Sequence, residues 1–287
     1  MKISRVGVVG AGTMGRGIAQ ALVRHGYTAV LYDSEPAALE SARAKISAGL
    51  GREVAKGACS EAERQAAESR LNATRELSNL AASDFIIEAV PENLDVKAGV
   101  FRSLDPICGA ETIFASNTSS ISITRLARLT RRPQLMAGMH FFNPVPAMKL
   151  VEVVAGLETA EAAVECVEKL AVSLGKTPIR VKDSPGFVSN RLLMPMINEA
   201  VYTLMEGVSD AKGVDGVMKL GMNHPMGPLE LADLIGLDVC LETMRVLYQG
   251  FSDSKYRPCP LLERMVNAGR LGRKTGRGFY EYPKPAA

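Results

Sequence analysis

Long apolar runs are absent from this sequence. The longest fall far short of the roughly 18 consecutive apolar residues that a membrane-spanning helix needs. A strand-like apolar run is already under way at Val6, which leaves no room for an amino-terminal signal peptide. The sequence therefore predicts a cytoplasmic protein without a membrane partner.

An excess of charge of one sign is also absent, and aromatic side chains are few. Lys plus Arg is 34 and Asp plus Glu is 31, so the net charge is +3, and aromatic residues make up 5% of the chain. There are no repeats, low-complexity tracts or interleaved aromatic and basic residues of the kind found in nucleic-acid binders. We therefore expect no nucleic-acid partner.

Paired cysteine motifs are missing as well. The five cysteines are an odd number and none belongs to a C-x-x-C pair, which indicates reduced thiols rather than a disulfide framework or a zinc site. No metal is implied. What remains is an ordinary soluble composition, 47% hydrophobic and 23% charged, over 287 residues, enough for one large or two medium domains.

The amino-terminal segment carries a dinucleotide-binding pattern. A buried-strand run, Arg5–Gly10, leads directly into Gly10-Ala11-Gly12-Thr13-Met14-Gly15, and a helical pattern follows. Gly10 permits the tight turn, Gly12 lets the backbone approach a pyrophosphate, and Gly15 lets helix and strand pack closely. In this strand-turn-helix context the motif predicts a nucleotide site.

A second strand, Thr28–Tyr32, ends in Asp33, at the distance from the glycines where an acidic residue accepts hydrogen bonds from the adenosine ribose. Ser34 and Glu35 come next, with no arginine nearby, so a 2′-phosphate would meet repulsion. The pattern favours NAD over NADP.

The segment from Pro36 to about Arg70 is rich in helix-forming residues and too long for an ordinary crossover, so we predict a helical hairpin inserted into the nucleotide domain. Its basic side chains could contact the phosphates of a bulky substrate. They could equally form a solvated helix face. These side chains are Arg43, Lys45, Arg52 and Lys56.

Polar residues follow two further predicted strands. Phe85–Val90 runs into Pro91-Glu92-Asn93, and Thr112–Ser116 runs into Asn117–Ser120. Ligands of open α/β folds bind at the carboxyl ends of strands, so both clusters are site candidates. A competing explanation is that Ser120 or Ser122 only caps the next helix, near Ile123–Leu129. Asn72–Thr74 is a further candidate strand.

The stretch around His140 is the candidate for the chemistry. An apolar run, Leu135–Met139, ends at His140, and a second run, Leu150–Val154, contains Glu152. A glutamate in such a run needs a buried partner, and neighbouring strands could bring it to the imidazole. The pair would be a general base with an orienting carboxylate, or simply a buried structural pair.

The other two of the three histidines have structural explanations. His25 precedes Gly26 at a helix end, where the helix dipole explains it, and His224 lies in a turn between helices. His140 is therefore the histidine at the ligand edge of the predicted sheet.

A helix near 160–174 and a strand at Thr177–Val181 complete the sheet, and Asp183–Gly186 marks a boundary. Helical periodicity then continues to the end of the chain. We predict an α/β Rossmann-type NAD-binding domain at 1–184 and an all-α domain at 185–287. The glycine-rich basic segment Leu271–Tyr280 could cover a phosphate-bearing ligand or be mere surface.

Several motifs, in this order, resemble those of the 3-hydroxyacyl-CoA dehydrogenases over nearly the whole chain. The length resembles the stand-alone 3-hydroxybutyryl-CoA dehydrogenases in particular. The motifs are Gly10–Gly15, Ser116–Ser120, His140–Pro144, Asp183–Phe187, Asn223–Pro228 and Gly272–Gly276.

This resemblance implies a reversible, NAD-dependent oxidation of a (3S)-3-hydroxyacyl-CoA by a dimer that associates through its helical domain. His140 would be the general acid/base with Glu152 as its partner, Ser119 would bond the substrate hydroxyl, and Asn190 would assist at the substrate. The residues implied around NAD, besides the glycine turn with Thr13 and Met14, are Asp33, Glu92, Lys97, Asn117, Asn143 and Lys274.

The match is weakest in the helical insertion, where Gly49 and Gly51 interrupt the helix pattern, so Arg52 and Lys56 are only tentative contacts for CoA. Two other functions remain open. One is a dehydrogenase of a CoA-free hydroxy acid or sugar acid, and the other is a non-catalytic NAD-binding protein. The presence of Ser119, His140, Glu152 and Asn190 together argues against the second.

Overall fold

The structure is a computed structural model that describes residues 2–283. It divides into two compact units, Met1–Ser184 and Pro185–Ala287, which are described separately below. Each unit has its own core of buried apolar side chains.

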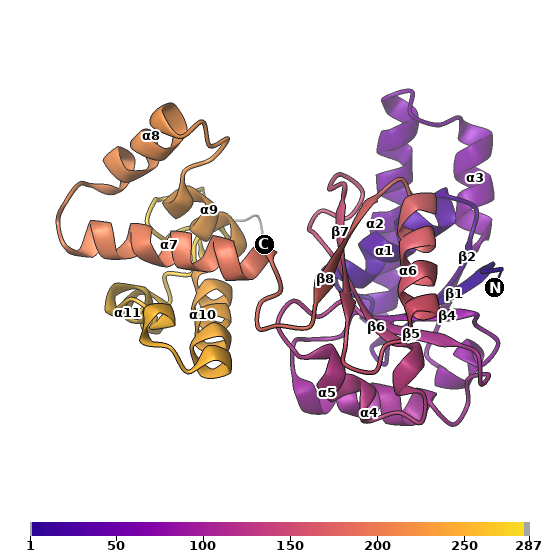
Figure 1. Ribbon diagram of the computed structural model, residues 1–287. Coiled ribbons are helices and arrows are strands. Elements are labelled where there is room, and N and C mark those ends of the chain that lie inside the picture. Colours follow the sequence, from indigo (N-terminus) through magenta and orange to yellow (C-terminus); the bar gives the residue numbers. More distant parts are fainter. Residues whose placement is uncertain (1, 284–287) are drawn as a thin grey trace. The chain divides into compact units, whose positions relative to one another are not determined.

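The first unit is built on one eight-stranded sheet with the order β3-β2-β1-β4-β5-β6-β7-β8 (Figure 1). All neighbouring strands are parallel except β6 and β7, which are antiparallel. The strands are β1 (Arg5–Val9), β2 (Thr28–Tyr32), β3 (Leu71–Thr74), β4 (Phe85–Glu88), β5 (Ile113–Ser116), β6 (Met136–Phe141), β7 (Leu150–Ala155) and β8 (Thr177–Lys182).

The strand order reverses at β1. The chain builds β2 and β3 outward on one side of β1, then crosses over to β4, β5 and β6 on the other. Such a reversal opens a crevice at the carboxyl ends of the strands, where open α/β sheets bind their ligands. The predicted Rossmann-type fold is confirmed.

Helices cover both faces of the sheet. Helices α1 and α6 lie on one face and α4 and α5 on the other (Figure 1). The helices of this unit are α1 (Thr13–Arg24), α2 (Pro36–Ala55), α3 (Glu61–Ser69), α4 (Leu94–Leu104), α5 (Ile123–Ala127) and α6 (Glu161–Ser173), with short 3₁₀ turns at Leu77–Leu80 and Pro133–Leu135.

The helical hairpin between β2 and β3 is present as α2 and α3. Helix α2 runs without a break through Gly49, where a Cβ atom would lie 2.5 Å from Oε1 of Gln20 on α1. Gly49 therefore marks a close crossing of two helices rather than an interruption. Glu53 ties the crossing together, because Gln20 Nε2 and Arg24 Nε donate to its carboxylate at 2.9 and 3.1 Å.

The second unit is helical, as predicted. Helix α10 packs against α7, α9 and α11 around fully buried Leu237, Cys240 and Leu247. Its helices are α7 (Ser189–Met205), α8 (Ala211–Gly221), α9 (Pro228–Ile235), α10 (Leu237–Phe251) and α11 (Pro260–Asn267), with 3₁₀ turns at Ser254–Tyr256 and Arg273–Thr275.

The glycine-rich segment at the end of the second unit is anchored to α9. The backbone N–H groups of Phe279 and Tyr280 donate to the Asp233 carboxylate at 3.0 and 2.9 Å. A Cβ on Gly278 would lie 1.9 Å from Oδ1 of Asp233, so glycine is required for this approach. Asp233 thus fixes the path of the segment within its own unit.

Within residues 2–283 no helix has both the length and the apolar character needed to cross a bilayer. All five cysteines are free thiols. The same residues contain no cluster of three or more His, Cys, Asp or Glu side chains arranged to hold a metal ion.

The glycine turn provides a matched pair of stability variants. A Cβ on Gly15 would lie 1.7 Å from the Gly10 carbonyl oxygen, a backbone atom that cannot move aside, whereas one on Gly12 meets nothing within 4 Å. Gly15→Ala should therefore destabilise the fold by about 3 kcal/mol or more, and Gly12→Ala by about 1 kcal/mol at most. Urea unfolding followed by circular dichroism compares the two, and equal stabilities would refute the predicted close packing.

Candidate active site

The turn between β1 and α1 has the form that a pyrophosphate requires. Gly10 has φ +102° and donates its N–H to the Tyr32 carbonyl at 2.8 Å. Gly12 is the N-cap residue of α1, no side chain caps this end, and the space beside the Gly12 Cα is open. Helix N-termini bind anions through their N–H groups and positive dipole, so the turn, including Thr13 and Met14 at the start of α1, fits the diphosphate of NAD.

Asp33 holds this turn against the end of β2. Its Oδ2 accepts from the Ala11 N–H at 2.7 Å and its Oδ1 from the Glu35 N–H at 3.0 Å. Each carboxylate oxygen has a second lone pair, which leaves capacity for ribose hydroxyls.

No arginine follows Asp33 closely in the sequence, but one contacts the next residue in space. Arg75 Nε donates to the Ser34 carbonyl at 3.3 Å. Arg75 directly follows β3, and since β3 is parallel to β2, its exit comes alongside the exit of β2. This contact cannot be inferred from the residues that adjoin Asp33 in the sequence.

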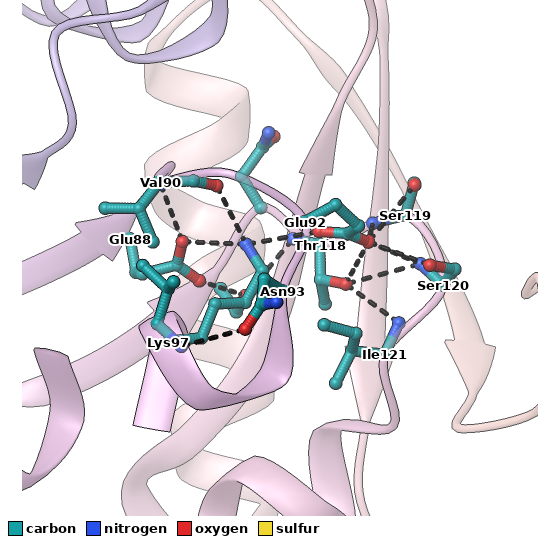
Figure 2. Close-up of polar contacts among 12 residues, drawn as sticks. Glu88, Val90, Glu92, Asn93, Lys97, Thr118, Ser119, Ser120 and Ile121 are labelled. Atoms are coloured by element: carbon teal, nitrogen blue, oxygen red, sulfur yellow. Dashed lines mark hydrogen bonds and ion pairs between the residues drawn. The ribbon is translucent and has the colours of Figure 1, made fainter. Parts of the chain in front are cut away.

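Glu92 joins the ends of β4 and β5. Its Oε1 accepts hydrogen bonds from Thr118 Oγ1 at 2.6 Å, from the N–H groups of Ser119 and Ser120 at 2.9 and 3.1 Å, and from their hydroxyls at 3.3 and 2.9 Å (Figure 2). The loop that carries Ser119 is therefore ordered around one carboxylate. The helix cap that follows is Ser122, whose Oγ accepts from the Arg125 N–H at 3.2 Å.

Behind Glu92 lies Lys97, whose side chain is only 1% exposed. Its Nζ lies 2.8 Å from Oε1 of Glu88 and 3.2 Å from Oε2 of Glu92. Burial raises the pKa of Glu88, and Lys97 opposes this shift only in part. Burial also acts to raise the pKa of Glu92, but Lys97 and the hydroxyl donors outweigh it and hold the pKa below its usual range.

Glu88 was missed in the sequence, although a signal was present. It is a glutamate within the otherwise apolar strand Phe85-Ile86-Ile87-Glu88. The same reasoning that singled out Glu152 predicts a buried partner here too.

His140 and Glu152 face each other across the antiparallel pair β6 and β7. His140 Nδ1 lies 2.8 Å from Glu152 Oε2, and the two residues are 7% and 2% exposed. A proton on Nδ1, donated to this carboxylate, makes Nε2 the basic nitrogen of the neutral ring. The Phe142 ring packs on the imidazole with centroids 4.6 Å apart.

Asn117 connects this pair to the preceding strand exit. Its Oδ1 accepts the Phe141 N–H at 2.9 Å, so the ends of β5 and β6 are held in register. The ends of β4, β5 and β6 thus bring Glu92, Ser119 and His140 to one edge of the sheet. This edge can supply a general base with an orienting carboxylate and a nearby hydroxyl.

A cavity of about 260 Å³ lies between α1, α2 and the loop after β6. Arg16, Lys45 and Arg52 line it, together with Asn143, and none of its lining residues is acidic. Lys56, the C-cap of α2, is exposed and does not line it. Lys176 fixes the loop by donating to the carbonyls of Val145 and Met148, and burial lowers its pKa.

The two remaining predicted residues belong to the second unit. Asn190 lies in the first turn of α7, and Lys274 Nζ lies 2.6 Å from the Asp238 carboxylate. Their roles beside substrate and cofactor remain predictions.

Comparison with known proteins identifies relatives along the whole chain. Residues 5–184 match the family described as 3-hydroxyacyl-CoA dehydrogenase, NAD binding domain, and residues 186–282 match 3-hydroxyacyl-CoA dehydrogenase, C-terminal domain. A probable 3-hydroxybutyryl-CoA dehydrogenase of Bacillus subtilis is 52% identical over 282 residues, 98% of each chain.

Solved structures agree with this match. The crystal structure of (S)-3-hydroxybutyryl-CoA dehydrogenase from Ralstonia eutropha has a TM-score of 0.96 and 51% identity, covering 99% of this chain and 100% of the other. A more distant structure, a dehydrogenase of a pyridine carboxylic acid described as an NAD+ dependent dismutase, has a TM-score of 0.81 and 33% identity, covering 98% and 92%.

Proposed function

The chain belongs to the 3-hydroxyacyl-CoA dehydrogenase family, and we propose that its substrate is a short-chain (3S)-3-hydroxyacyl-CoA, 3-hydroxybutyryl-CoA above all. It is an NAD-dependent dehydrogenase. The observation that carries the assignment of roles is the buried His140–Glu152 pair at the edge of the sheet where Ser119 lies.

His140 takes the proton of the substrate's 3-hydroxyl on Nε2, and in the reverse direction it returns the proton to the ketone oxygen. Glu152 keeps Nδ1 protonated and stabilises the imidazolium. Ser119 orients the hydroxyl, and Asn190 assists at the substrate. NAD+, when bound, supplies the hydride acceptor.

The glycine turn and the strand ends hold the cofactor in this proposal. Gly10, Gly12 and Gly15 with Thr13 and Met14 cradle the diphosphate, and Asp33 accepts from the adenosine ribose. The further residues that we assign to the cofactor are Glu92, Lys97, Asn117 and Asn143 of the first unit and Lys274 of the second. Lys97, being buried, acts on the nucleotide through its ion pair with Glu92.

The cationic cavity supports a phosphate-bearing substrate. Three basic side chains line it without an acidic neighbour, as a phosphate group would require. We assign Arg52 to the CoA phosphates, with Lys56 as a less direct contact. A CoA-free hydroxy acid would make no use of this cavity, although the pyridine carboxylic acid dehydrogenase is a relative with such a substrate.

The second unit supports dimerisation. Val217 and Leu220 on α8 and Met222 just after it are 63%, 92% and 62% exposed, an apolar surface that a second copy of the chain would cover. Two copies of this chain would then associate through their helical units.

Substitution of the general base tests the mechanism. His140→Gln should lower turnover by roughly 100- to 10,000-fold, because proton transfer loses its catalyst, while NADH still binds. Exposed His25→Gln is the control and should keep wild-type turnover. Initial rates of NADH oxidation with acetoacetyl-CoA decide the matter, and near-normal turnover of His140→Gln would reject the assignment.

Arg52→Gln tests the CoA contact. Loss of one charged contact to a phosphate should raise KM for acetoacetyl-CoA by roughly three- to tenfold and leave turnover at saturation nearly unchanged. Arg43→Gln, an exposed arginine on the same helix that does not line the cavity, serves as the matched control. Equal KM values for the two variants would remove Arg52 from the site.

Leu220→Glu tests the dimer. At 92% exposure this side chain contributes little to its own fold, so a charge there should convert a dimer to monomers without lowering thermal stability. Leu157→Glu, 84% exposed in the nucleotide-binding unit, should stay dimeric. Sedimentation velocity gives the answer, and a monomeric wild type would already contradict the proposal.

A further inference from the structure

Glu88 is a buried carboxylate to which the mechanism so far gives no task. It is 0% exposed at the end of β4. Its Oε1 accepts from the Val90 N–H at 2.7 Å and from Lys97 Nζ at 2.8 Å (Figure 2). Its Oε2 lies 2.6 Å from Ser116 Oγ.

The contacts of Glu88 match its ionised form. Ser116 Oγ accepts the Thr118 N–H at 3.2 Å, so its own proton is available for Glu88. All three neighbours then act as donors, and 2.6 Å is the usual length of a hydroxyl-to-carboxylate bond. Burial raises the pKa of this carboxyl, while Lys97, Ser116 and the Val90 N–H stabilise the charge.

Lys97 shares its charge between two carboxylates. Besides Glu88 at 2.8 Å and Glu92 at 3.2 Å, its Nζ contacts the Val90 carbonyl at 3.2 Å, so three acceptors match the three protons of an ammonium. One cation and two carboxylates leave a net charge of −1. Glu88 is sealed from solvent and closer to Lys97, whereas the Glu92 side chain is 37% exposed, so the unbalanced charge lies at Glu92.

The position of Glu92 bears on the relative affinities of the protein for the oxidised and the reduced nucleotide. Between β1, which ends at the glycine turn, and β6, which carries His140, the sheet places β4 and β5. A dinucleotide with its diphosphate at Gly12 and its reactive ring beside His140 must cross the ends of these two strands, where Glu92 holds the Ser119 loop. The nicotinamide ring is positively charged in NAD+ and neutral in NADH.

We propose that Glu88 is a positioning residue that holds and neutralises Lys97, so that Glu92 keeps a net negative charge at the strand ends and favours binding of NAD+ relative to NADH. The inference rests on the proposed function, because it uses the placement of the cofactor along this edge. In this proposal Glu88, which lies away from the reacting atoms, influences the relative affinities for NAD+ and NADH.

The test compares dissociation constants of the full chain for NAD+ and NADH, by calorimetry and by NADH fluorescence. Glu88→Gln keeps an oxygen for the Val90 N–H and Lys97 while it removes the charge. The ratio of the NAD+ constant to the NADH constant should rise by roughly four- to fifteenfold, as expected for one unit charge about 10 Å away at an effective dielectric of about 20 to 40.

A double variant separates charge from structure. Glu88→Gln with Lys97→Met removes one charge of each sign, leaves Glu92 with its −1, and should return the ratio to the wild-type value. A purely structural role for Glu88 would weaken both nucleotides together and would not be reversed by a second change in the same cluster.

An unchanged ratio in Glu88→Gln overturns the inference. If that variant does not fold, a ratio shifted fourfold or more in the double variant contradicts the charge argument. A wild-type protein that binds neither nucleotide would instead refute the proposed function. Binding of both with an unmoved ratio refutes only the role of Glu88.

Discussion

A carboxylate buried in an apolar strand must find a donor, and this requirement organises the functional edge of the protein. Glu152 in β7 meets His140 in β6, and Glu88 in β4 meets Lys97 in α4. Leaving either glutamate unpaired would cost several kcal/mol, a large part of the stability of a typical domain. Each pair therefore fixes the relative positions of two elements, and with them the groups that face the ligand edge.

The two pairs serve different purposes although their physics is the same. In the His140–Glu152 pair the carboxylate accepts at Nδ1 and favours one tautomer of the imidazole, and in the proposed mechanism this tautomer presents Nε2 for proton transfer. In the Glu88–Lys97 pair the two charges nearly cancel. The neighbouring carboxylate of Glu92, which holds the loop carrying Ser119, therefore keeps most of its negative charge. In the two proposals the first pair acts on proton transfer, and the second acts on the conformation and the electrostatic potential of the neighbouring strand ends.

Much of this could be predicted from the sequence. The glycine turn, the helical hairpin and both domain types follow from local patterns whose physical cause is local: glycine geometry, helix propensity and periodicity. The contact between His140 and Glu152 was foreseeable because a glutamate in an apolar run needs a partner. Its geometry was not, since a slip of one residue between β6 and β7 would turn the two side chains to opposite faces.

The features that could not be predicted from the sequence depend on contacts between segments far apart in the chain. Arg75 reaches Ser34 only because β3 lies alongside β2. In the sequence Gly49 resembles a helix breaker. In the structure it allows α2 to cross α1 closely at Gln20. Glu88 carried the same signal as Glu152, but its partner lies on a helix, and no strand pattern points to it.

The most direct test of the proposed function is the rate at which the wild-type protein oxidises NADH with acetoacetyl-CoA, compared with the rate with acetoacetate. The cationic cavity, the buried base and the family predict turnover of the thioester on the order of 1 to 1,000 per second, and a kcat/KM for acetoacetate lower by several orders of magnitude. Comparable kcat/KM for the two compounds, or no oxidation with the thioester, would contradict it.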